Sequence, residues 1–259
     1  MTKLNKISII LATYNAGKYL ESALQSIIQQ DYACLEIIII DGKSQDDTVS
    51  IINKYQKNIS FWKSESDEGI YDAWNKGIEI STGEWIIFLG SDDVLLPDSL
   101  ISYSNFINSL NTEVDIISSK MLYTDKNMKP YRTMGWEWEW PKSQLEMTIA
   151  HTGALHSKKL FERVGKFNTG YKIVGDYELL LRAGKNLKAA FLNKVTVMYR
   201  DGGVSDSYAA ILESFKASRT TGKSPFIRSL LYSAFVFIKY SIRKSLQLAN
   251  INVYLKSHN

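Results

Sequence analysis

Cysteine is almost absent from this chain of 259 residues, in which Cys34 is the only one. A lone cysteine has no partner for an internal disulfide or for a zinc-binding CxxC pair, which fits a reducing compartment. No basic segment followed by an apolar core opens the chain, so a secretion signal is not expected. No segment reaches the roughly 18 to 20 uninterrupted apolar residues of a membrane-spanning helix. These absences predict a cytoplasmic protein without a transmembrane anchor.

Acidic residues are missing from the last part of the chain. The formal net charge is +4, but residues 221–259 hold six Lys or Arg and no Asp or Glu. Apolar and aromatic residues alternate with these basic ones, which is typical of a helix on an anionic membrane surface. Packing on the rest of the chain or on a partner is the alternative. So much aliphatic surface between the charges argues against nucleic acid as a partner.

An apolar content of 45% is enough for the core of one large α/β domain or two small ones. Nearly continuous apolar runs at 35–41 and 84–90 are typical of parallel strands that are covered on both faces. Segments of helical spacing separate the strands, so the first half is predicted to be a doubly wound, mostly parallel sheet flanked by helices. The expected strands are 7–13, 35–41, 59–64 and 84–90, and the expected helices are 17–30, 46–57 and 70–80.

The second half of the chain alternates less regularly, with a hairpin predicted at "YTDKNMKPYR". A change of composition at 220–225 marks the best linker. It divides the chain into a main domain at 1–220, with halves at 1–96 and 97–220, and a basic helical tail at 221–259. The expected helices are 98–109, 158–164 and 176–185, and the expected strands lie near 114–119 and 188–199.

Two adjacent carboxylates, Asp92 and Asp93, follow the apolar run "EWIIFLG". In an open α/β sheet, ligands bind beyond the carboxyl ends of the strands. Carboxylates there repel a phosphate unless a divalent cation lies between them, and oxygen ligands favour Mg²⁺ or Mn²⁺. The alternative is a turn or the cap of a following helix, because Asp caps helices well.

Four stretches in series give the sequence its resemblance to a known family. They are "ISIILATYNAGKYLESALQSIIQQDY", "LEIIIIDGKSQDDTVSII", "DEGIYDAWNKGIEISTGEWIIFLGSDD" and "YKIVGDYELLLRAG". In this order they resemble the family 2 glycosyltransferases of the bacterial surface-polysaccharide type, over roughly residues 5–205. The resemblance implies the GT-A fold, in which a mixed, mostly parallel sheet is flanked by helices. It also implies transfer of a sugar from a nucleoside diphosphate donor, with a UDP-sugar favoured.

The resemblance further implies which residues bind the donor. Thr13, at the end of the first strand, and Tyr14 and Asn15, which follow it, fall where the family holds the nucleotide base and the ribose. Asp41 falls where a carboxylate accepts from the base, and Asp67 where the family often has an acidic residue near the nucleotide. The implied nucleotide-binding residues are Thr13, Tyr14, Asn15, Asp41, Gly42 and Asp67, together with Asp92 and His151.

A metal ligand and a catalytic base follow from the same resemblance. Asp93 corresponds to the last carboxylate of an Asp-x-Asp-type motif that holds Mn²⁺ or Mg²⁺, and Asp92 to its middle position, with Ser91 in place of the first Asp. Asp176, in "GDYELLLR", corresponds to the base that takes the proton from the attacking hydroxyl. Gly175 stands where some relatives carry Glu. The alternative for Asp176 is a helix N-cap.

Three further features carry alternatives. His151 is expected either to meet the diphosphate or acceptor or to pack in the core. The loop "YRDGGVSDSY", with Gly202 and Gly203, is expected either to close over the diphosphate or to form a plain turn. "WEWEWP" at 136–141 alternates with period two, which predicts a half-buried strand with three indoles on one face. Stacking on an acceptor sugar is its alternative.

Residues and resemblance together predict an inverting, metal-dependent glycosyltransferase that acts on a hydroxyl of a glycan acceptor. With the basic tail, the acceptor is expected to be linked to polyprenyl diphosphate, in O-antigen or capsule biosynthesis. The protein is then expected to lie peripherally on the inner face of the plasma membrane. The alternatives are a sugar-1-phosphate nucleotidyltransferase and a non-catalytic nucleotide-sugar-binding component of a membrane assembly complex. The former should have a Gly- and Arg-rich loop where this chain has "TYNAGK".

Overall fold

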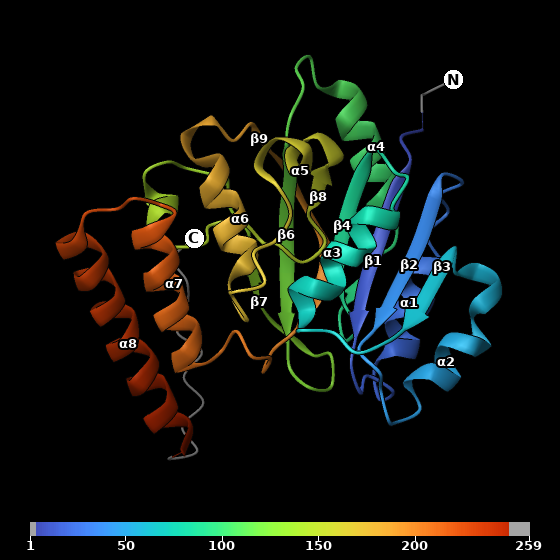
Figure 1. The fold of residues 1–259 in the computed structure, drawn as a ribbon, viewed down its shortest axis with the longest axis horizontal. Helices are drawn as coiled ribbons and strands as arrows, with labels where there is room; N and C mark the ends of the chain where they lie inside the picture. Colours follow the sequence, from blue (N-terminus) through green and yellow to red (C-terminus); the bar gives the residue numbers. More distant parts are fainter. Residues whose placement is uncertain (1–3, 249–259) are drawn as a thin grey trace.

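The computed structural model describes residues 4–248. Within that range the chain forms one nine-stranded sheet with helices on both faces (Figure 1). The strand order is β3-β2-β1-β4-β8-β6-β9-β5, and β7 pairs with β6 outside this path. The strands are β1 (Ile7–Thr13), β2 (Leu35–Asp41), β3 (Phe61–Ser64), β4 (Trp85–Gly90), β5 (Val94–Leu95), β6 (Ile116–Thr124), β7 (Pro130–Met134), β8 (Leu155–Ser157) and β9 (Ala189–Arg200). The helices are α1 (Leu20–Ile28), α2 (Thr48–Lys54), α3 (Ile70–Ile80), α4 (Ser99–Ser109), α5 (Lys158–Val164), α6 (Gly175–Ala183), α7 (Tyr208–Thr220) and α8 (Phe226–Leu248).

The first half of the sheet is parallel, as predicted. β1 pairs with β2 on one side and with β4 on the other, so Thr13 lies opposite Asp41 and Ala12 lies opposite Gly90. Side chains of β1 alternate between two cores. Ile9 packs in the core with α1 and α4, and Ile10 packs in the core with α3 and α6. This burial on both faces explains why the strands are nearly continuous apolar runs.

Most of the expected limits in this half are confirmed, including 7–13, 35–41 and 70–80. α1 is shorter than 17–30 because the chain first makes a turn, in which the amides of Tyr19 and Leu20 both donate to the carbonyl of Ala16. α2 is shorter than 46–57 because it gives way to a 3₁₀ turn at Gln56–Asn58.

Antiparallel strands make the second half of the sheet mixed. β8 lies between β4 and β6 and is antiparallel to both. The predicted hairpin forms between β6 and β7, and the region 188–199 is the single strand β9, parallel to β6. The sequence does not predict β5, β8 or α7. Strands of two or three residues are too short to show a period. α7 buries only small side chains, Ala210, Ala217 and Ser218, so no stripe of large apolar residues marks it.

The prediction of a strand at 136–141 is wrong. β7 ends at Met134, and residues 136–140 belong to no strand. The chain turns away at Gly135, whose φ is 122°, and a Cβ at that position would lie 2.3 Å from the carbonyl oxygen of Ser119. The alternating indoles therefore have no strand to pair with. Trp138 and Trp140 instead stack on each other, with ring centroids 6.2 Å apart.

The helical tail is present and folds back on the main domain. α8 lies beside α7, to which it is joined by the turn at residues 221–225 (Figure 1). The last part of the predicted tail, residues 249–259, lies outside the described residues. None of the helices in the described part of the chain is long and apolar enough to span a bilayer. The division of the chain at residue 220 remains a prediction.

Two glycines with almost the same backbone angle allow a test of the turn at Gly135. A Cβ at Gly69, with φ 119°, would meet nothing within 4 Å, whereas one at Gly135 would collide with backbone. Gly69→Ala should lower the free energy of unfolding by about 1–3 kcal/mol through backbone strain alone. Gly135→Ala should lower the free energy of unfolding by roughly a further 1–3 kcal/mol through overpacking. Urea denaturation measures both, and equal losses would contradict the close approach at Gly135.

Candidate active site

Polar side chains gather at the carboxyl ends of the parallel strands in two neighbouring groups. The first group, at the ends of β1 and β2 and after β3, contains six predicted residues and is called the nucleotide group here. The second surrounds a cavity of about 410 Å³ lined by parts of β4, β6, β7, β9, α3 and α6. The nucleotide group comprises Thr13, Tyr14, Asn15, Asp41, Gly42 and Asp67. The predicted residues that line the cavity are Asp92, Asp93, His151 and Asp176.

Asp41 is the most heavily bonded carboxylate of the nucleotide group. It is fully buried and accepts from the hydroxyls of Thr13 at 2.9 Å, Ser44 at 2.5 Å and Ser64 at 2.6 Å, and from the Ser44 amide at 3.0 Å. Burial alone raises the pKa of Asp41, but these hydrogen bonds outweigh it and hold the pKa below its usual value. Asp41 is therefore an ionised carboxylate that ties β1, β2 and β3 together. A base would reach it only if one of the hydroxyls turned away.

Tyr14, Gly42 and Asp67 lie in contact range of one another. A Cβ at Gly42 would lie 2.7 Å from Oδ2 of Asp67 and 3.4 Å from the Tyr14 ring, so a larger residue there would displace the Asp67 carboxylate. Tyr14 is 68% exposed, which leaves its ring free to stack on a planar ligand. Asn15 has a positive φ of 48°, and its amide donates to the Ser44 hydroxyl at 2.8 Å. These contacts bring the predicted donor-binding residues together.

Asp92 and Asp93 form an acidic pair at the end of β4. A Cβ at Gly90 would lie 2.7 Å from Oδ2 of Asp93 and 3.0 Å from Oδ1 of Asp92, so both carboxylates approach the same point, and a larger residue there would displace them. Neither caps a helix, because the next helix, α4, has Asp98 as its N-cap residue. The helix-cap alternative for this pair is therefore wrong, whereas the turn is observed, because the Asp93 amide donates to the Gly90 carbonyl at 3.1 Å. Gly90 lines the cavity and is missing from the prediction.

Both carboxylate oxygens of Asp93 accept hydrogen bonds. Its Oδ2 accepts from the Thr152 hydroxyl at 2.6 Å, and its Oδ1 accepts from the amide of Arg200 at 3.1 Å. Burial, and then the negative charge of Asp92, raise the pKa of Asp93 to about 7. Burial also raises the pKa of Asp92. Two carboxylates that are both disfavoured as anions would be stabilised by a cation between them.

The acidic pair suits a hard divalent cation that is shared with a substrate. The described residues contain no group of three or more His, Cys, Asp or Glu arranged to hold a metal ion. Mg²⁺ and Mn²⁺ are commonly held by one or two carboxylates, with water and substrate phosphates completing the shell. Asp92 and Asp93 therefore fit such an ion better than they fit zinc or calcium.

Asp176 lies in the first turn of α6, with 24% of its side chain exposed. Its Oδ1 accepts from the Tyr177 amide at 2.8 Å and from the Tyr71 hydroxyl at 3.3 Å. The N-cap of α6 is Val174, so the N-cap alternative for Asp176 is wrong. Burial raises the pKa of Asp176 to about 6, against the opposing effect of these hydrogen bonds. A carboxylate of this pKa is ionised at neutral pH and is still basic enough to accept a proton.

Tyr71 is a second residue that the sequence reading missed. Its single hydroxyl proton is shared between the Ile173 carbonyl at 2.7 Å and Oδ1 of Asp176 at 3.3 Å, and burial raises its pKa well above the usual value, so the hydroxyl stays protonated. A Cβ at Gly175 would lie 2.8–2.9 Å from the Tyr71 ring. The Tyr71 ring can lie against the start of α6 only because residue 175 is glycine. No local pattern reveals this contact, because Tyr71 and Asp176 are 105 positions apart.

His151 is a neutral packing residue at the wall of the cavity. Its ring stacks against Trp74 and Phe88, with centroid distances of 5.5 and 5.8 Å. Burial lowers the pKa of His151 to about 3, so the 3.8 Å approach of its Nδ1 to Oδ2 of Asp176 is not an ion pair. Its Nε2 is buried and has no hydrogen-bond partner among the described residues. The packing alternative thus describes its ring, while Nε2 keeps an unused hydrogen-bonding position that is closed to solvent.

Arg200 brings a positive charge to the acidic pair. Its guanidinium lies over the Tyr19 ring, 4.1 Å from the centroid, and its Nε donates to the carbonyl of Asp92 at 3.3 Å. The loop that follows β9, residues 201–207, supplies Gly203, Val204 and Ser205 to the cavity wall. The loop therefore borders the cavity, whereas its closure over the diphosphate remains a prediction.

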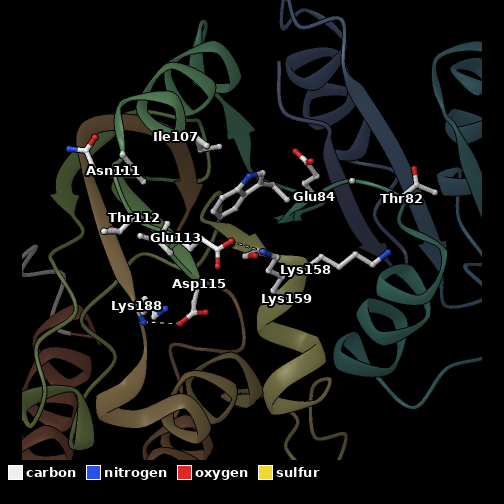
Figure 2. Close-up of a pocket in the computed structure, with 15 residues that line it drawn as sticks. Thr82, Glu84, Ile107, Asn111, Thr112, Glu113, Asp115, Lys158, Lys159 and Lys188 are labelled. Carbon is white, nitrogen blue, oxygen red and sulfur yellow. Dashed lines mark hydrogen bonds and ion pairs between the residues drawn. The ribbon is translucent and has the colours of Figure 1, made fainter. Parts of the chain in front are cut away.

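A larger cavity, of about 680 Å³, lies at the other end of the sheet, near the start of β4 and β6 (Figure 2). Its charged side chains are largely bound to neighbours. Lys159 pairs with Glu113 at 2.7 Å, and Asp115 accepts from the Lys188 amide at 2.8 Å and pairs with Arg163 at 2.6 Å. It has none of the predicted site residues, so size alone does not identify the active site.

The raised pKa of Asp176 can be tested through the pH dependence of protein stability. Its ionised form is disfavoured in the folded protein, so its contribution to stability is complete below pH 3.8 and is lost as pH rises through about 6. The loss amounts to about 3 kcal/mol at most. Asp176→Asn removes this titration, so its stability relative to wild type should rise by about 1–2 kcal/mol between pH 5 and pH 8. Urea denaturation at both pH values measures the change, and a pH-independent difference would contradict the raised pKa.

Solved structures with the same arrangement confirm the GT-A type of fold. TarS 1–349 of S. aureus, in complex with UDP-GlcNAc, matches with a TM-score of 0.66 over 96% of this chain and 76% of that chain, at 18% identity. The mannosyltransferase PcManGT of Pyrobaculum calidifontis, in complex with GDP-Man and Mn²⁺, matches with a TM-score of 0.65 over 98% and 77% of the two chains, also at 18% identity. At such identities the likeness establishes the fold.

Sequence comparison identifies the family. A PGL/p-HBAD biosynthesis glycosyltransferase of Mycobacterium bovis is 28% identical over 207 residues, which cover 77% of this chain and 79% of the relative. The profile described as "Glycosyl transferase family 2" matches residues 8–163, more than half of the chain. With the acidic pair and Asp176 facing one cavity at the carboxyl ends of the strands, this match shows that the chain belongs to glycosyltransferase family 2.

Proposed function

We propose that this glycosyltransferase is an inverting, metal-dependent enzyme that moves a sugar from a UDP-linked donor to a hydroxyl of a glycan acceptor. One observation carries the proposal: a carboxylate suited to proton transfer, Asp176, and an acidic pair suited to a cation, Asp92 and Asp93, line the same 410 Å³ cavity. Inverting transfer requires a base on one face of the sugar and charge neutralisation at the leaving diphosphate on the other.

The donor nucleotide would occupy the nucleotide group. Tyr14 offers an exposed ring for the base, and the end of β1, with Thr13 and Asn15, offers hydrogen-bonding groups to the base and ribose. In this proposal Asp41 accepts from the base after Ser44 or Ser64 releases it. Gly42 and Asp67 complete the contact. S. aureus TarS with UDP-GlcNAc and P. calidifontis PcManGT with GDP-Man support a nucleotide-sugar donor.

Asp93 and Asp92 would hold Mn²⁺ or Mg²⁺. When bound, such an ion supplies charge neutralisation for the nucleoside diphosphate leaving group. Thr152 and the Arg200 amide fix the Asp93 carboxylate, so its position does not depend on the ligand. Arg200 and His151 line the same cavity, where the Arg200 guanidinium would contact the diphosphate, and His151 would meet the diphosphate or the acceptor if its buried ring turned toward them.

Asp176 would take the proton of the attacking hydroxyl on Oδ2. Its other oxygen, Oδ1, is held by Tyr71 and the Tyr177 amide, which leaves Oδ2 without a hydrogen bond in the described structure. The acceptor oxygen forms a bond to the anomeric carbon from the face opposite the diphosphate, and the bond from that carbon to the diphosphate oxygen breaks. The hydroxyl proton ends on Oδ2, so atoms and charge balance.

The acceptor is proposed to be a glycan linked to polyprenyl diphosphate, in surface-polysaccharide assembly such as O-antigen or capsule. The protein would then work peripherally at the inner face of the plasma membrane, with the basic tail toward the lipid. The six basic and no acidic residues of 221–259 support this placement. Trp138 and Trp140 do not line the cavity, and Trp136 is exposed beyond β7, where an extended acceptor could stack on it.

A donor screen tests the reaction. Purified protein should release UDP in preference to GDP or dTDP from matched donors, with Mn²⁺ or Mg²⁺ required. Asp176→Asn and Asp93→Asn should each lower kcat by roughly a thousandfold, because one removes the base and the other a metal ligand. Asp31→Asn, at an exposed position away from the cavity, is the matched control and should keep wild-type activity. Turnover that needs neither a divalent cation nor Asp93 would contradict the metal-dependent mechanism. Full activity of Asp176→Asn would show that Asp176 is not the catalytic base.

Tyr71→Phe tests whether Tyr71 positions the base. Its hydroxyl lowers the pKa of Asp176, so the variant should shift the acid limb of kcat/KM upward from about 6, by roughly half a unit to one unit. Activity should recover toward pH 8–9, where Asp176 is ionised again. Tyr55→Phe, whose hydroxyl bonds Glu21 on the other side of the sheet, is the control. An unchanged acid limb with a uniformly lower kcat would assign Tyr71 a packing role only.

A further inference from the structure

α8 has its polar and apolar sides reversed relative to an ordinary surface helix. In a globular protein the apolar stripe of a surface helix faces the core and the charged side faces water. In α8 the side chains directed toward the domain are mostly serines, tyrosines and basic residues. The most exposed of the large apolar side chains point away from it, whereas Phe226 and Phe237, at the edge of this side, contact the rings of Phe215 and Tyr208 in α7. Packing within the described chain does not account for this arrangement.

The inward contacts fix the rotation of α8 about its axis. Near its start, the Ser229 hydroxyl bonds the Ser218 hydroxyl of α7 at 3.0 Å, and in the middle the Tyr232 hydroxyl donates to Glu146. Near its end, three side chains converge on one residue of the loop that borders the cavity. They are Tyr240, which donates to the Asp206 carbonyl at 2.9 Å, Lys244, which pairs with the Asp206 carboxylate at 3.1 Å, and Arg243, which pairs with the same carboxylate.

The outward face of α8 is therefore a fixed apolar surface. We define it by five residues spaced over four turns, each between 54% and 70% exposed. They are Ile227, Leu231, Phe235, Ile238 and Ile242. Phe226, Leu230 and Phe237 flank it and are exposed as well. A contiguous apolar surface of this kind, held open by polar contacts on its other side, is typical of an interaction site.

The charges beside the outward face distinguish between two possible partners, a second copy of this chain and an anionic lipid bilayer. The exposed Arg228 and Lys239 border the outward face, and the sequence of the tail has no acidic residue to pair with them. Two copies of this chain packed face to face through α8 would bring like charges together without compensation. An anionic bilayer would accept the apolar side chains at its acyl boundary and the basic ones among its headgroups.

We propose that the outward face of α8 is the surface by which this protein lies on an anionic lipid bilayer. The proposal deepens the membrane placement in the proposed function and rests on it only for the biological role, because docking itself involves neither donor nor acceptor. Docking in this orientation places the loop 201–207 on the side of α8 away from the lipid, since Asp206 is bound by the inward side chains of that helix. A lipid-linked acceptor would therefore extend its glycan past α8 to reach the cavity.

Vesicle binding by the full chain tests the proposal. Wild type should co-sediment with vesicles of phosphatidylcholine and phosphatidylglycerol, more strongly as the anionic fraction rises and less strongly in high salt. Leu231→Ser/Ile238→Ser should weaken binding at least tenfold while the thermal unfolding midpoint stays near that of wild type. Leu4→Ser/Phe61→Ser, which alters two exposed apolar residues outside the tail, is the matched control and should bind like wild type. Arg228→Glu/Lys239→Glu should remove the dependence on anionic lipid.

Three outcomes would overturn it. One is vesicle binding by Leu231→Ser/Ile238→Ser equal to that of wild type. Another is a wild-type dimer that does not bind vesicles and that the same variant makes monomeric, because the face would then join two copies. The third is wild-type protein that binds only after residues 249–259 are removed, because the chain's own end would then cover the face. UDP release is measured on the same samples, so a failed docking test and a failed reaction are distinguished.

Discussion

The parallel pairing of β1 with both β2 and β4 is the constraint on which the site depends. Its register sets Thr13 opposite Asp41 and Ala12 opposite Gly90. Because both faces of these strands are buried, polar side chains are admitted only where the strands end. The nucleotide group and the acidic pair are therefore neighbours as a direct result of strand register. Asp41 strengthens that arrangement through four hydrogen bonds that reach three strands or the turns after them.

Burial gives the carboxylates of the cavity their chemical character and makes them unfavourable for stability. Asp93 and Asp176 have raised pKa values mainly because they are removed from water. Hydrogen bonds from Thr152, Tyr177 and Tyr71 offset only part of that effect. Two apolar clusters on opposite faces of the sheet lie beneath these carboxylates. Their burial stabilises the fold and offsets the cost of the buried carboxylates. A site that is poorly solvated before its ligands arrive is a common property of enzymes.

The sequence was sufficient for the features that repeat along the chain and insufficient for contacts between distant segments. The strands at 7–13 and 35–41 and the helix at 70–80 are predicted to the residue, because burial on both faces leaves a continuous apolar run in a strand and burial on one face leaves a helical period. Asp176 was placed correctly in the first turn of α6. Tyr71 was not recognised because its partner is far along the chain. The strand at "WEWEWP" was wrong because alternation signals a strand only where a neighbouring strand is available, and Gly135 turns the chain away from β6.

Gly175 and Tyr71 together determine how Asp176 is held in this chain. A larger side chain at 175 and the Tyr71 ring exclude each other sterically, since any Cβ at 175 would lie within 2.9 Å of the ring. A chain of this fold with Glu at position 175 would have to place an aromatic ring at position 71 elsewhere. Replacing Gly175 alone would displace the Tyr71 ring and remove one of the two hydrogen bonds to Oδ1 of Asp176. Positions 71 and 175 are therefore expected to change as a pair.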